Sequence, residues 1–433
     1  MSHYLFALTD GGGTVPPEVG VARRLVDRGH RVRVLAEASM ENEIRAIGAE
    51  FVPWEPAGPA SGSAPAAAAY RDWETRNPWT LARGMSNHMI AGPAREQARR
   101  LLAAVDTERP DLVVCSFVAF GAMAGAEAAG VPFDVLVPNI YPLPAAGLPP
   151  TGTGWPPART ELGRFRDRAV NAATTRMLSH FTVPRLNELR TDLGSAPLQV
   201  IWDQVHHARR QHVLTSRSFD FPAELPPTAS YAGPMLDDPV WAHADDWPIP
   251  AGTGPLILVA LSSTYQAQQR CVQNVIDALA RLPVRGLVTT GPGLDPRDLR
   301  GRARIEIVRS APHTQVIDRA DLVVTHGGHG TVMKALVAGR PIVVLPHGRD
   351  QPDNAARVIA RGAGLTVRRT ASPARIAGAV QKVLASRSYT DAARRLGDRI
   401  RAEVTRSPLV DELERLCPGG PPYRWTPHPE GPR

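Results

Sequence analysis

A glycine-rich turn in the second half of the chain has the residue types needed to bind a diphosphate. The turn, HGGHG at 326–330, follows the apolar run Leu322–Thr325 and precedes a segment whose apolar residues recur at helical spacing. We expect the helix to open at Thr331, where its unpaired N–H groups and partial positive charge favour an anion. His326 and Thr331 add side-chain donors. The alternative is a plain glycine turn with two solvated histidines.

Polar side chains also follow the next apolar run, Pro341–Leu345. Asp350, Gln351 and Asn354 come after it, and in an open α/β sheet such residues emerge at the carboxyl edge, where ligands bind. An acid beside an amide suits the hydroxyl groups of a sugar. The alternative is a strand-to-helix turn that binds nothing and has Asp353 as its N-cap. For Asp353 itself we favour this structural role.

The loop DGGGTVPPEV at 10–19 looks like a phosphate loop but has different spacing. A dinucleotide fingerprint reads G-x-G-x-x-G. Gly11 and Gly13 supply the first two glycines, and Pro16 occupies the third position. Proline is compatible with the start of a helix, but it does not allow the close helix–strand packing that glycine gives. The loop is therefore not predicted to bind NAD.

These motifs belong to an alternation of strands and helices. In the first half, apolar runs near 3–9, 31–37, 50–54, 111–117 and 131–138 alternate with helical patterns near 17–29, 41–47, 92–105 and 159–194. The alternation restarts at residue 256, and three further helices are predicted between 372 and 416. Strand–helix–strand units imply parallel sheets.

Two α/β domains are predicted, 1–232 and 255–405. The intervening segment 233–254 is rich in proline, lacks periodicity and is interpreted as a linker. Residues 406–433 are predicted to form a helix that returns toward the first domain, followed by a disordered tail. The Pro/Ala/Gly/Ser stretch at 56–69 is expected to be a mobile loop, and 141–157 a surface loop.

Composition excludes several classes of function. The 433 residues suit two domains, no apolar run is long enough to cross a membrane, and we interpret the N-terminus as lacking a signal peptide. The net charge of +8 comes from scattered arginines with no block of like charge, so no nucleic-acid partner is expected. Cys115, Cys271 and Cys417 lie far apart, which suits a reducing cytoplasm and argues against a disulfide framework or a zinc site.

The segment HGGHGT at 326–331, followed by GRDQPDNAARV at 348–358, resembles the donor-binding signature of family 1 glycosyltransferases. Within that family the likeness is to the bacterial macrolide and natural-product group. It extends from the N-terminal loop through YAGP at 231–234 to the segment 256–367. The resemblance implies the α/β GT-B architecture, in which two Rossmann-like domains with parallel sheets face each other across a cleft. It also implies inverting transfer without a metal ion or cofactor.

The resemblance assigns donor-binding roles position by position. The diphosphate would contact His326, Gly327, Gly328, Gly330 and Thr331, and the donor sugar would contact Asp350, Gln351 and Asn354. The loop that reaches the phosphates would contribute Ser262, Ser263 and Thr264. The nucleobase would lie against Pro312 and His313. Many relatives have an aromatic residue where this chain has Ser310. Base stacking is therefore not implied here, and main-chain groups of this loop would read a uracil or thymine edge.

The acceptor-side loop departs from the family pattern. Thr14 stands where the family has a catalytic histidine, and Ser116 where it has the partner aspartate. A threonine hydroxyl is too weakly basic to replace the histidine. Three explanations remain open: an acceptor that needs little deprotonation, a different base such as Asp10, Glu18 or His88, or a protein that only binds. Asp10 is alternatively a turn residue and Glu18 a first-turn acid that favours the helix dipole. We expect Thr14 to orient the acceptor.

The predicted function is transfer of a hexosyl group from a UDP- or dTDP-sugar to a small natural-product acceptor. A cytoplasmic monomer or homodimer is expected, with no cofactor, metal, membrane or nucleic-acid partner. One alternative is a non-catalytic nucleotide-sugar-binding or auxiliary protein. The other is a sugar-nucleotide epimerase of similar architecture.

Overall fold

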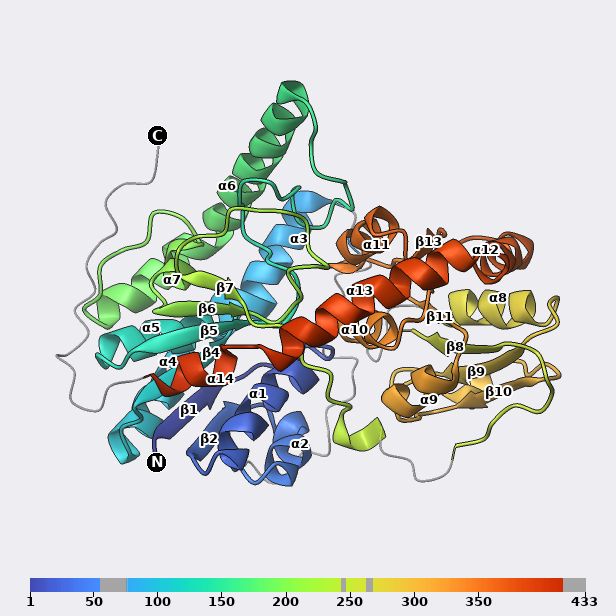
Figure 1. The fold of residues 1–433 in the computed structure, drawn as a ribbon. Coiled ribbons are helices and arrows are strands. Elements are labelled where there is room, and N and C mark those ends of the chain that lie inside the picture. Colours follow the sequence, from blue (N-terminus) through green and yellow to red (C-terminus); the bar gives the residue numbers. More distant parts are fainter. Residues whose placement is uncertain (55–74, 76, 243–246, 262–267, 416–433) are drawn as a thin grey trace.

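The computed structural model describes residues 1–54, 75, 77–242, 247–261 and 268–415. The predicted mobile loop at 56–69, the predicted donor residues 262–264 and the predicted tail from 416 onward lie outside the described residues. Figure 1 shows two α/β units side by side, each built on one twisted sheet. The predicted fold class is confirmed, because every strand pair within both sheets is parallel.

The first sheet has seven strands in the order β3-β2-β1-β4-β5-β6-β7. Its strand order reverses between β1 and β4, which is the switch point where ligands of open α/β sheets bind. The register pairs Tyr4 with Val32 on one side and with Leu112 on the other. The strands are β1 (His3–Ala7), β2 (Arg31–Ala36), β3 (Glu50–Pro53), β4 (Leu112–Ser116), β5 (Phe133–Val137), β6 (Arg210–Val213) and β7 (Ala229–Tyr231).

Helices cover both faces of the first sheet. One face packs against α1, α2 and the C-terminal α14, and the other against α4, α5, α6 and α7. The N-terminal helices and short helical turns are α1 (Val15–Asp27), η1 (Ala38–Met40), α2 (Glu41–Ala46), α3 (Pro78–Met85), η4 (Ser86–Ile90), α4 (Ala91–Thr107), α5 (Phe120–Ala128), α6 (Glu161–Asp192) and α7 (Asp203–His206).

The second sheet has six strands in the order β10-β9-β8-β11-β12-β13, so its switch point lies between β8 and β11. Helices α8 and α12 pack on one face, and α9, α10, α11 and α13 on the other. The strands are β8 (Leu256–Ala260), β9 (Arg285–Thr289), β10 (Ile305–Val308), β11 (Leu322–Thr325), β12 (Ile342–Val344) and β13 (Gly364–Thr366).

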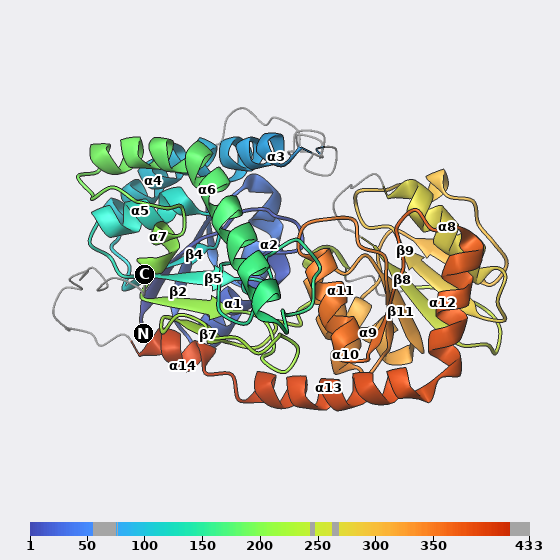
Figure 2. The same ribbon diagram turned by 90° about the horizontal axis from the view of Figure 1, so that it is seen from above.

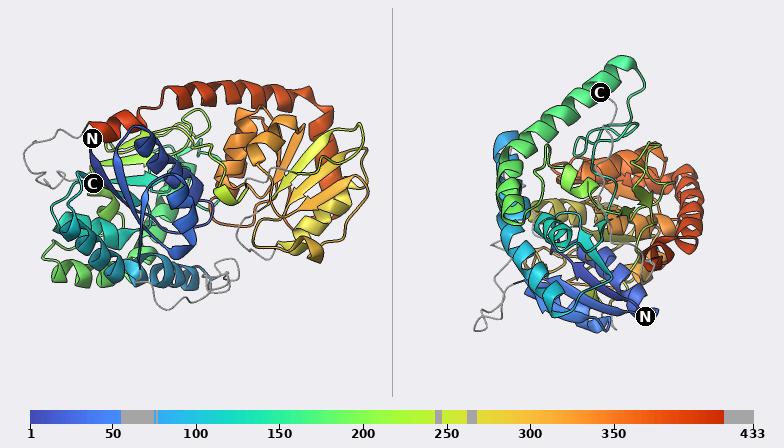
Figure 3. Two further views of the ribbon diagram at one scale, coloured as in Figure 1. Left: turned by 90° about the horizontal axis from the view of Figure 1, so that it is seen from below. Right: turned by 90° about the vertical axis from the view of Figure 1, so that its left-hand side faces the viewer.

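Helix α13 connects the two units along one side of the molecule, and Figures 2 and 3 show it running from α12 to α14. The predicted linker segment 233–254 contains the short turn η5 (Val240–Ala242). The helices after it are α8 (Gln269–Leu279), η6 (Pro296–Asp298), α9 (His313–Arg319), α10 (His329–Val337), α11 (Gln351–Ala360), α12 (Pro373–Ala385), α13 (Arg387–Thr405) and α14 (Leu409–Glu414).

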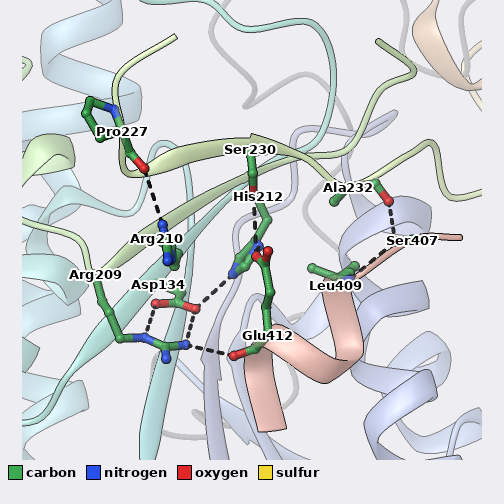
Figure 4. Close-up of polar contacts among 10 residues, drawn as sticks. All are labelled: Asp134, Arg209, Arg210, His212, Pro227, Ser230, Ala232, Ser407, Leu409 and Glu412. Carbon is green, nitrogen blue, oxygen red and sulfur yellow. Dashed lines mark hydrogen bonds and ion pairs between the residues drawn. The ribbon is translucent and has the colours of Figure 1, made fainter. Parts of the chain in front are cut away.

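The short helix α14 contacts the first sheet through a partly buried charged network (Figure 4). Asp134 accepts two hydrogen bonds from Arg209, of 2.9 and 2.7 Å, and lies 2.8 Å from His212 Nε2. His212 Nδ1 is 3.6 Å from a carboxylate oxygen of Glu412 on α14. Leu413 is fully buried beside this network. Helix α14 therefore returns to the sheet that contains β1.

The prediction of a surface loop at 141–157 is wrong in part. Tyr141, Leu143 and Leu148 pack into the core of the first unit because they are apolar residues next to the end of β5. Further along, the main-chain N–H groups of Gly152 and Gly154 donate to Asp353 of α11, at 2.6 and 2.8 Å. The segment thus fills part of the first core and then contacts the second unit.

Candidate functional site

The predicted donor residues gather at the carboxyl edge of the second sheet. The turn 326–328 follows β11 at the switch point, the loop 345–350 follows neighbouring β12, and Pro312 and His313 precede and open α9. Three separate stretches of sequence thus meet at one edge, as the parallel topology requires. The predicted residues Ser262, Ser263 and Thr264 follow β8, the other strand of the switch point, and lie outside the described residues.

The turn after β11 needs glycine for two different reasons. Gly327 has φ +96°, and a Cβ there would lie 2.8 Å from Val344 Cγ1. Gly328 has an ordinary φ of −59°, but a Cβ there would lie 2.6 Å from His326 Nε2. The His326 ring therefore lies directly over the bare main chain of Gly328. A ligand at this turn would meet main-chain amides and an imidazole edge together.

Helix α10 begins at His329, two residues before the predicted start at Thr331. Its N-cap is Gly328, and no side chain caps it. The helix begins early because the backbone of Gly328 and His329 already supports the first turn. The N–H groups of this first turn are therefore available to an anion, and Thr331 is partly exposed beside them.

Of the two histidines of the turn, His329 is buried and His326 is partly exposed, so the alternative with two solvated histidines does not hold for His329. His329 is 8% exposed, and its Nε2 lies 3.3 Å from the carbonyl oxygen of Leu214 in the first unit. Burial lowers the pKa of His329 to about 4 and that of His326 to about 3. Both rings are therefore neutral near pH 7. His326 can offer an N–H hydrogen bond to a phosphate, without a positive charge.

Asp350, Gln351 and Asn354 form one hydrogen-bonded unit with the glycine turn. Asn354 Nδ2 donates to the carbonyl oxygen of Gly327 and to Asp350 Oδ2, both at 2.9 Å. Gln351 Oε1 accepts from the N–H groups of His347 and Gly348, at 2.7 and 3.2 Å. Burial raises the pKa of Asp350, and the bond from Asn354 offsets part of that rise. Asn354 and Gln351 thus fix the two loops, and Asp350 lies between them.

Asp353 does not cap α11, so that structural prediction is wrong. The N-cap position belongs to Asp350, whose side chain makes no capping bond. Asp353 lies inside the first turn, is 2% exposed and binds the Gly152 and Gly154 amides of the other unit. Burial raises its pKa, and these two bonds offset part of the rise. Asp353 therefore points toward the first unit, and its neighbour Asn354 points toward the donor turn.

A partly buried histidine positions the predicted nucleobase loop. Pro312 is the N-cap of α9, and His313 Nε2 lies 3.0 Å from the hydroxyl of Thr289 at the end of β9. Burial lowers the pKa of His313 to about 4, so this ring is neutral as well. The sheet edge thus presents hydrogen-bonding groups in place of cationic histidines.

Asp10 occupies the turn of the N-terminal loop. Its Oδ1 accepts from the Gly12 N–H at 2.9 Å and its Oδ2 from Ser39 Oγ at 2.6 Å. The main-chain N–H of Asp10 donates to Glu37 Oε2 at 2.9 Å. This geometry matches the turn role described for Asp10 and holds the loop beside Glu37.

Glu18 and Ser116, predicted on separate grounds, are in direct contact. Ser116 Oγ donates to Glu18 Oε1 at 2.7 Å and lies 3.3 Å from Thr9 Oγ1. Glu18 is fully buried, which raises its pKa to about 8. The sequence signal was available: Glu18 interrupts an apolar stripe that contains Val15 and Ala22 at helical spacing. Thr9 was missed, because nothing in its local sequence distinguishes it.

Thr14 is the N-cap residue of α1, and its hydroxyl does not cap the helix. It is partly exposed, at the carboxyl edge of the first sheet and one helical turn before Glu18. His88, the other suggested base, is an exposed residue of the π-helical turn η4, which packs against α6. The structure therefore places Thr14, and not His88, at the switch point with Ser116.

The donor turn of the second unit contacts the carboxyl edge of the first sheet. His329 of the donor turn contacts Leu214, which directly follows β6 of the first sheet. Residues 237–238 bridge the two glycine-loop helices: Asp237 contacts Arg24 of α1 at 3.1 Å, and Asp238 forms an ion pair with Lys334 of α10. The helices that follow the two glycine-rich loops are thus both tied to this segment.

Comparisons with known proteins agree with this arrangement. Residues 276–416 match the family model described as "Erythromycin biosynthesis protein CIII-like, C-terminal domain". The chain is 28% identical over 429 residues to 4'-demethylrebeccamycin synthase of Lentzea aerocolonigenes, which covers 95% of this chain and 99% of that protein.

Two solved structures share the whole fold. The glycotransferase of kitacinnamycin has a TM-score of 0.71 and 24% identity, with 96% of this chain and 99% of that chain covered. Glycosyltransferase VinC in complex with dTDP has a TM-score of 0.66 and 19% identity, with 96% and 99% covered.

The chain thus has the GT-B architecture, and the predicted resemblance to glycosyltransferases is confirmed by the comparisons. More particularly, its residues 276–416 are similar to the erythromycin biosynthesis protein CIII-like C-terminal domain, and the chain is similar along its length to 4'-demethylrebeccamycin synthase. Within the described ranges, no group of three or more His, Cys, Asp or Glu side chains is arranged to hold a metal ion. The helices in those ranges include none with the length and apolar character to cross a membrane.

Proposed function

We propose that this protein moves a sugar from a dTDP- or UDP-sugar to a small natural-product acceptor, with inversion and without a metal ion. The observation that carries the proposal is the N-terminus of α10, which no side chain caps. It follows a glycine turn at the switch point of the second sheet, where the main chain is uncovered. A leaving diphosphate gains negative charge as the bond to the sugar breaks. Oriented N–H groups and the helix dipole stabilise that charge without reorganising.

The donor site is assembled from neutral donors. His326 is held neutral by burial, which lowers its pKa to about 3, so it contributes a hydrogen bond. Thr331 adds a hydroxyl in the first turn of α10. Asp350 binds hydroxyl groups of the sugar, while Gln351 and Asn354 hold its loop through the bonds described above. The presence of dTDP in the VinC complex supports a pyrimidine nucleotide as the donor base.

Inversion follows from the opposed positions of donor and acceptor. The diphosphate rests on α10 of the second unit, and the acceptor enters from the edge of the first sheet at Thr14. A nucleophile approaching C1 from that side displaces the diphosphate in one step and inverts the anomeric configuration. Thr14 orients the acceptor through its hydroxyl, which makes no bond to the helix it precedes.

The test is nucleoside diphosphate release from UDP- and dTDP-sugars with and without an acceptor panel. Release that depends on an acceptor supports transfer, whereas isomerisation of the donor without an acceptor supports the epimerase alternative. Binding of the donor with neither outcome supports an auxiliary protein. Each result selects one of the three functions.

Two variants test the donor site itself. Thr331→Ala and Asp350→Ala should each weaken donor binding about tenfold or more in calorimetry, since each removes a polar contact to the donor. Lys382→Ala, in the last turn of α12, is the matched control and should bind normally. Unchanged donor affinity in both site variants would count against the site.

A further inference from the structure

Three side chains form a short hydrogen-bonded chain at the switch point of the first sheet. Thr9 follows β1, Ser116 ends β4, and Glu18 comes from the first turns of α1. The oxygen separations are 3.3 Å from Thr9 to Ser116 and 2.7 Å from Ser116 to Glu18. Thr9 is partly exposed, Ser116 is 2% exposed and Glu18 is fully buried. The chain of hydroxyl groups therefore leads from the carboxyl edge of the sheet to an interior carboxyl group.

The carboxyl group of Glu18 lies in the first turn of α1, where an acid favours the helix dipole, but its burial has no compensating charge among the described residues. No cation lies in ion-pair contact with it among the described residues, and its Oε2 has no hydrogen-bond partner there. Its neighbours on the helix face, Val15, Val19 and Ala22, are apolar. A leucine or glutamine would fill the same space at lower cost, because burying an unpaired acid is unfavourable. A buried acid in such a place is typical of a functional group.

Proton counting fixes the direction of the chain when Glu18 is ionised. A serine hydroxyl has one proton, and Ser116 donates it to Glu18. Ser116 can then only accept from Thr9. Thr9 must point its own proton at Ser116, which leaves the lone pairs of Thr9 Oγ1 free to accept a proton from outside. The chain is thus set to receive a proton at the sheet edge.

We propose that Thr9, Ser116 and Glu18 form a proton relay that deprotonates the acceptor, an inference that rests on the proposed transferase function. As the acceptor heteroatom bonds to C1, the C1–O bond breaks and its electron pair leaves with the diphosphate. The acceptor proton moves to Thr9 Oγ1, the Thr9 proton to Ser116 Oγ, and the Ser116 proton to Glu18 Oε1. Every hydroxyl is restored, and Glu18 ends as the neutral acid. Thr9 is the catalytic residue, and Ser116 and Glu18 act through it.

The titration of Glu18 suits this role. Desolvation raises its pKa to about 8, the hydrogen bond from Ser116 opposes that rise, and the charge of Glu37 adds to it. Three other titratable groups lie nearby. Burial raises the pKa of Glu37 to about 7, and Glu37 accepts a hydrogen bond from the main chain of Asp10. The third group is the thiol of Cys115 on β4. A base with a pKa near the working pH combines adequate basicity with an adequate ionised fraction.

The experiment compares two acceptors that differ only in their need for a base. Unsubstituted phenol has a pKa of ~10 and must lose its proton during transfer, whereas 4-nitrophenol is largely ionised in mildly basic solution. Glu18→Gln and Ser116→Ala should each lower kcat for phenol about 100-fold or more. Transfer to 4-nitrophenol should change only a few-fold. Thr9→Val should behave like Ser116→Ala, and Thr9→Ser, which keeps the hydroxyl, should restore transfer to phenol.

The pH profile separates the relay from a structural role. In the wild-type protein, kcat/KM for phenol should rise through pH values near the Glu18 pKa of about 8, and in Glu18→Gln this rise should vanish. Glu37→Gln is the matched control: it removes a neighbouring acid and should retain the rise at a lower apparent pKa. Donor affinity, measured by calorimetry, should be unchanged in all these variants.

Three results would overturn the relay. They are an unchanged pH profile in Glu18→Gln, an equal loss of both acceptors in Ser116→Ala, and loss of the rise in Glu37→Gln alone. A wild-type protein that binds the donor but never releases diphosphate in response to any acceptor would remove the proposed function, and the relay with it. The two failures are distinguishable, because only the second affects the wild-type chain.

Discussion

The Glu18 carboxyl group loses its hydration when the chain folds and gains only one hydrogen bond in return. Its pKa therefore rises from 4.5 to about 8, with desolvation as the main cause. Between these two values the folded protein binds a proton that the unfolded chain does not. By linkage, the unfolding free energy falls as pH rises through this window, and the loss is complete above the folded pKa.

The first prediction is that Glu18→Gln stabilises the protein at basic pH. Because the amide cannot ionise, the variant escapes the cost of a buried carboxylate, and its advantage over the wild type should grow from about pH 5 to about pH 8, reaching a few kcal/mol. Urea unfolding across this pH range measures the difference. A constant difference at all pH values would show that Glu18 is not buried as an acid.

The second prediction concerns Gly328. The three atoms nearest to an added Cβ there all belong to the His326 ring, which can rotate away. Gly328→Ala should change the unfolding free energy by less than about 1 kcal/mol, because the backbone conformation is ordinary and the ring can turn aside. Donor affinity should fall about tenfold, ~1.4 kcal/mol, because the ring and the methyl group then block the main chain. Gly378→Ala, in α12 with open space around it, should instead stabilise the fold and leave donor affinity unchanged. Calorimetry and urea unfolding measure both.

Local sequence chemistry predicted the glycine turn and the helix that follows it, and it did not predict the contact between Glu18 and Ser116. The pattern at 326–331 predicts a bare turn before a helix, because glycine, histidine and threonine have few other reasons to cluster there. The contact between Glu18 and Ser116 joins residues 98 positions apart and depends on strand order. The second role of Asp353 was unpredictable for the same reason, since its partners lie about 200 positions away in the other unit.

At the scale of elements, α14 illustrates how a short helix is fixed by its surroundings. Six residues cannot form a stable helix alone. Leu409 and Leu413 are buried against the first sheet, and Tyr4 donates its hydroxyl to the Leu413 carbonyl at 3.2 Å. The ionic network of Asp134, His212 and Glu412 surrounds this contact (Figure 4). Apolar burial therefore supplies the stability, and the charges set the position.

The third prediction follows from this division. Leu413→Ala should lower the unfolding free energy by about 2–5 kcal/mol, because it leaves a cavity in the core of the first unit. Asp411→Ala removes an exposed ion pair with Arg28 and should change it by less than about 1 kcal/mol. Thermal and urea unfolding report both values. A large effect of Asp411→Ala with a small effect of Leu413→Ala would reverse the assignment.

The succession of elements was predictable because buried parallel strands read as continuous apolar runs and helices as periodic ones. The runs Leu256–Ala260 and Leu322–Thr325 became central strands of the second sheet as predicted. The start of α10 was misplaced because glycine and histidine are poor helix formers, and tertiary contacts of His329 override that preference. Loop 141–157 was misjudged because its prolines and glycines conceal three core residues.

At the scale of the whole molecule, the two units are joined by buried polar contacts that α11 and α13 make with the segment 215–221. Arg357 of α11 is 2% exposed and donates to fully buried Asp220 at 2.7 Å. Glu403 of α13 accepts from the hydroxyl groups of Ser216 and Ser218. These contacts join the two units, so they restrict the orientation of the second unit relative to the first.

The last prediction tests this coupling with Arg357→Met. Removing the guanidinium leaves Asp220 as a buried, unpaired charge, which should cost about 3–5 kcal/mol in urea unfolding. The double variant Arg357→Met/Asp220→Asn removes the charge as well and should recover much of that loss, since the amide oxygen can accept from the Phe221 N–H and the amide NH2 group can donate to the Tyr231 hydroxyl. Donor affinity should stay near the wild-type value in the double variant, because the predicted donor residues all belong to the second unit. Its kcat should fall, because the acceptor edge is no longer held at a fixed position.

Equal stability of the single and double variants, or loss of donor binding with kcat preserved, would contradict a role for this ion pair in aligning the two units.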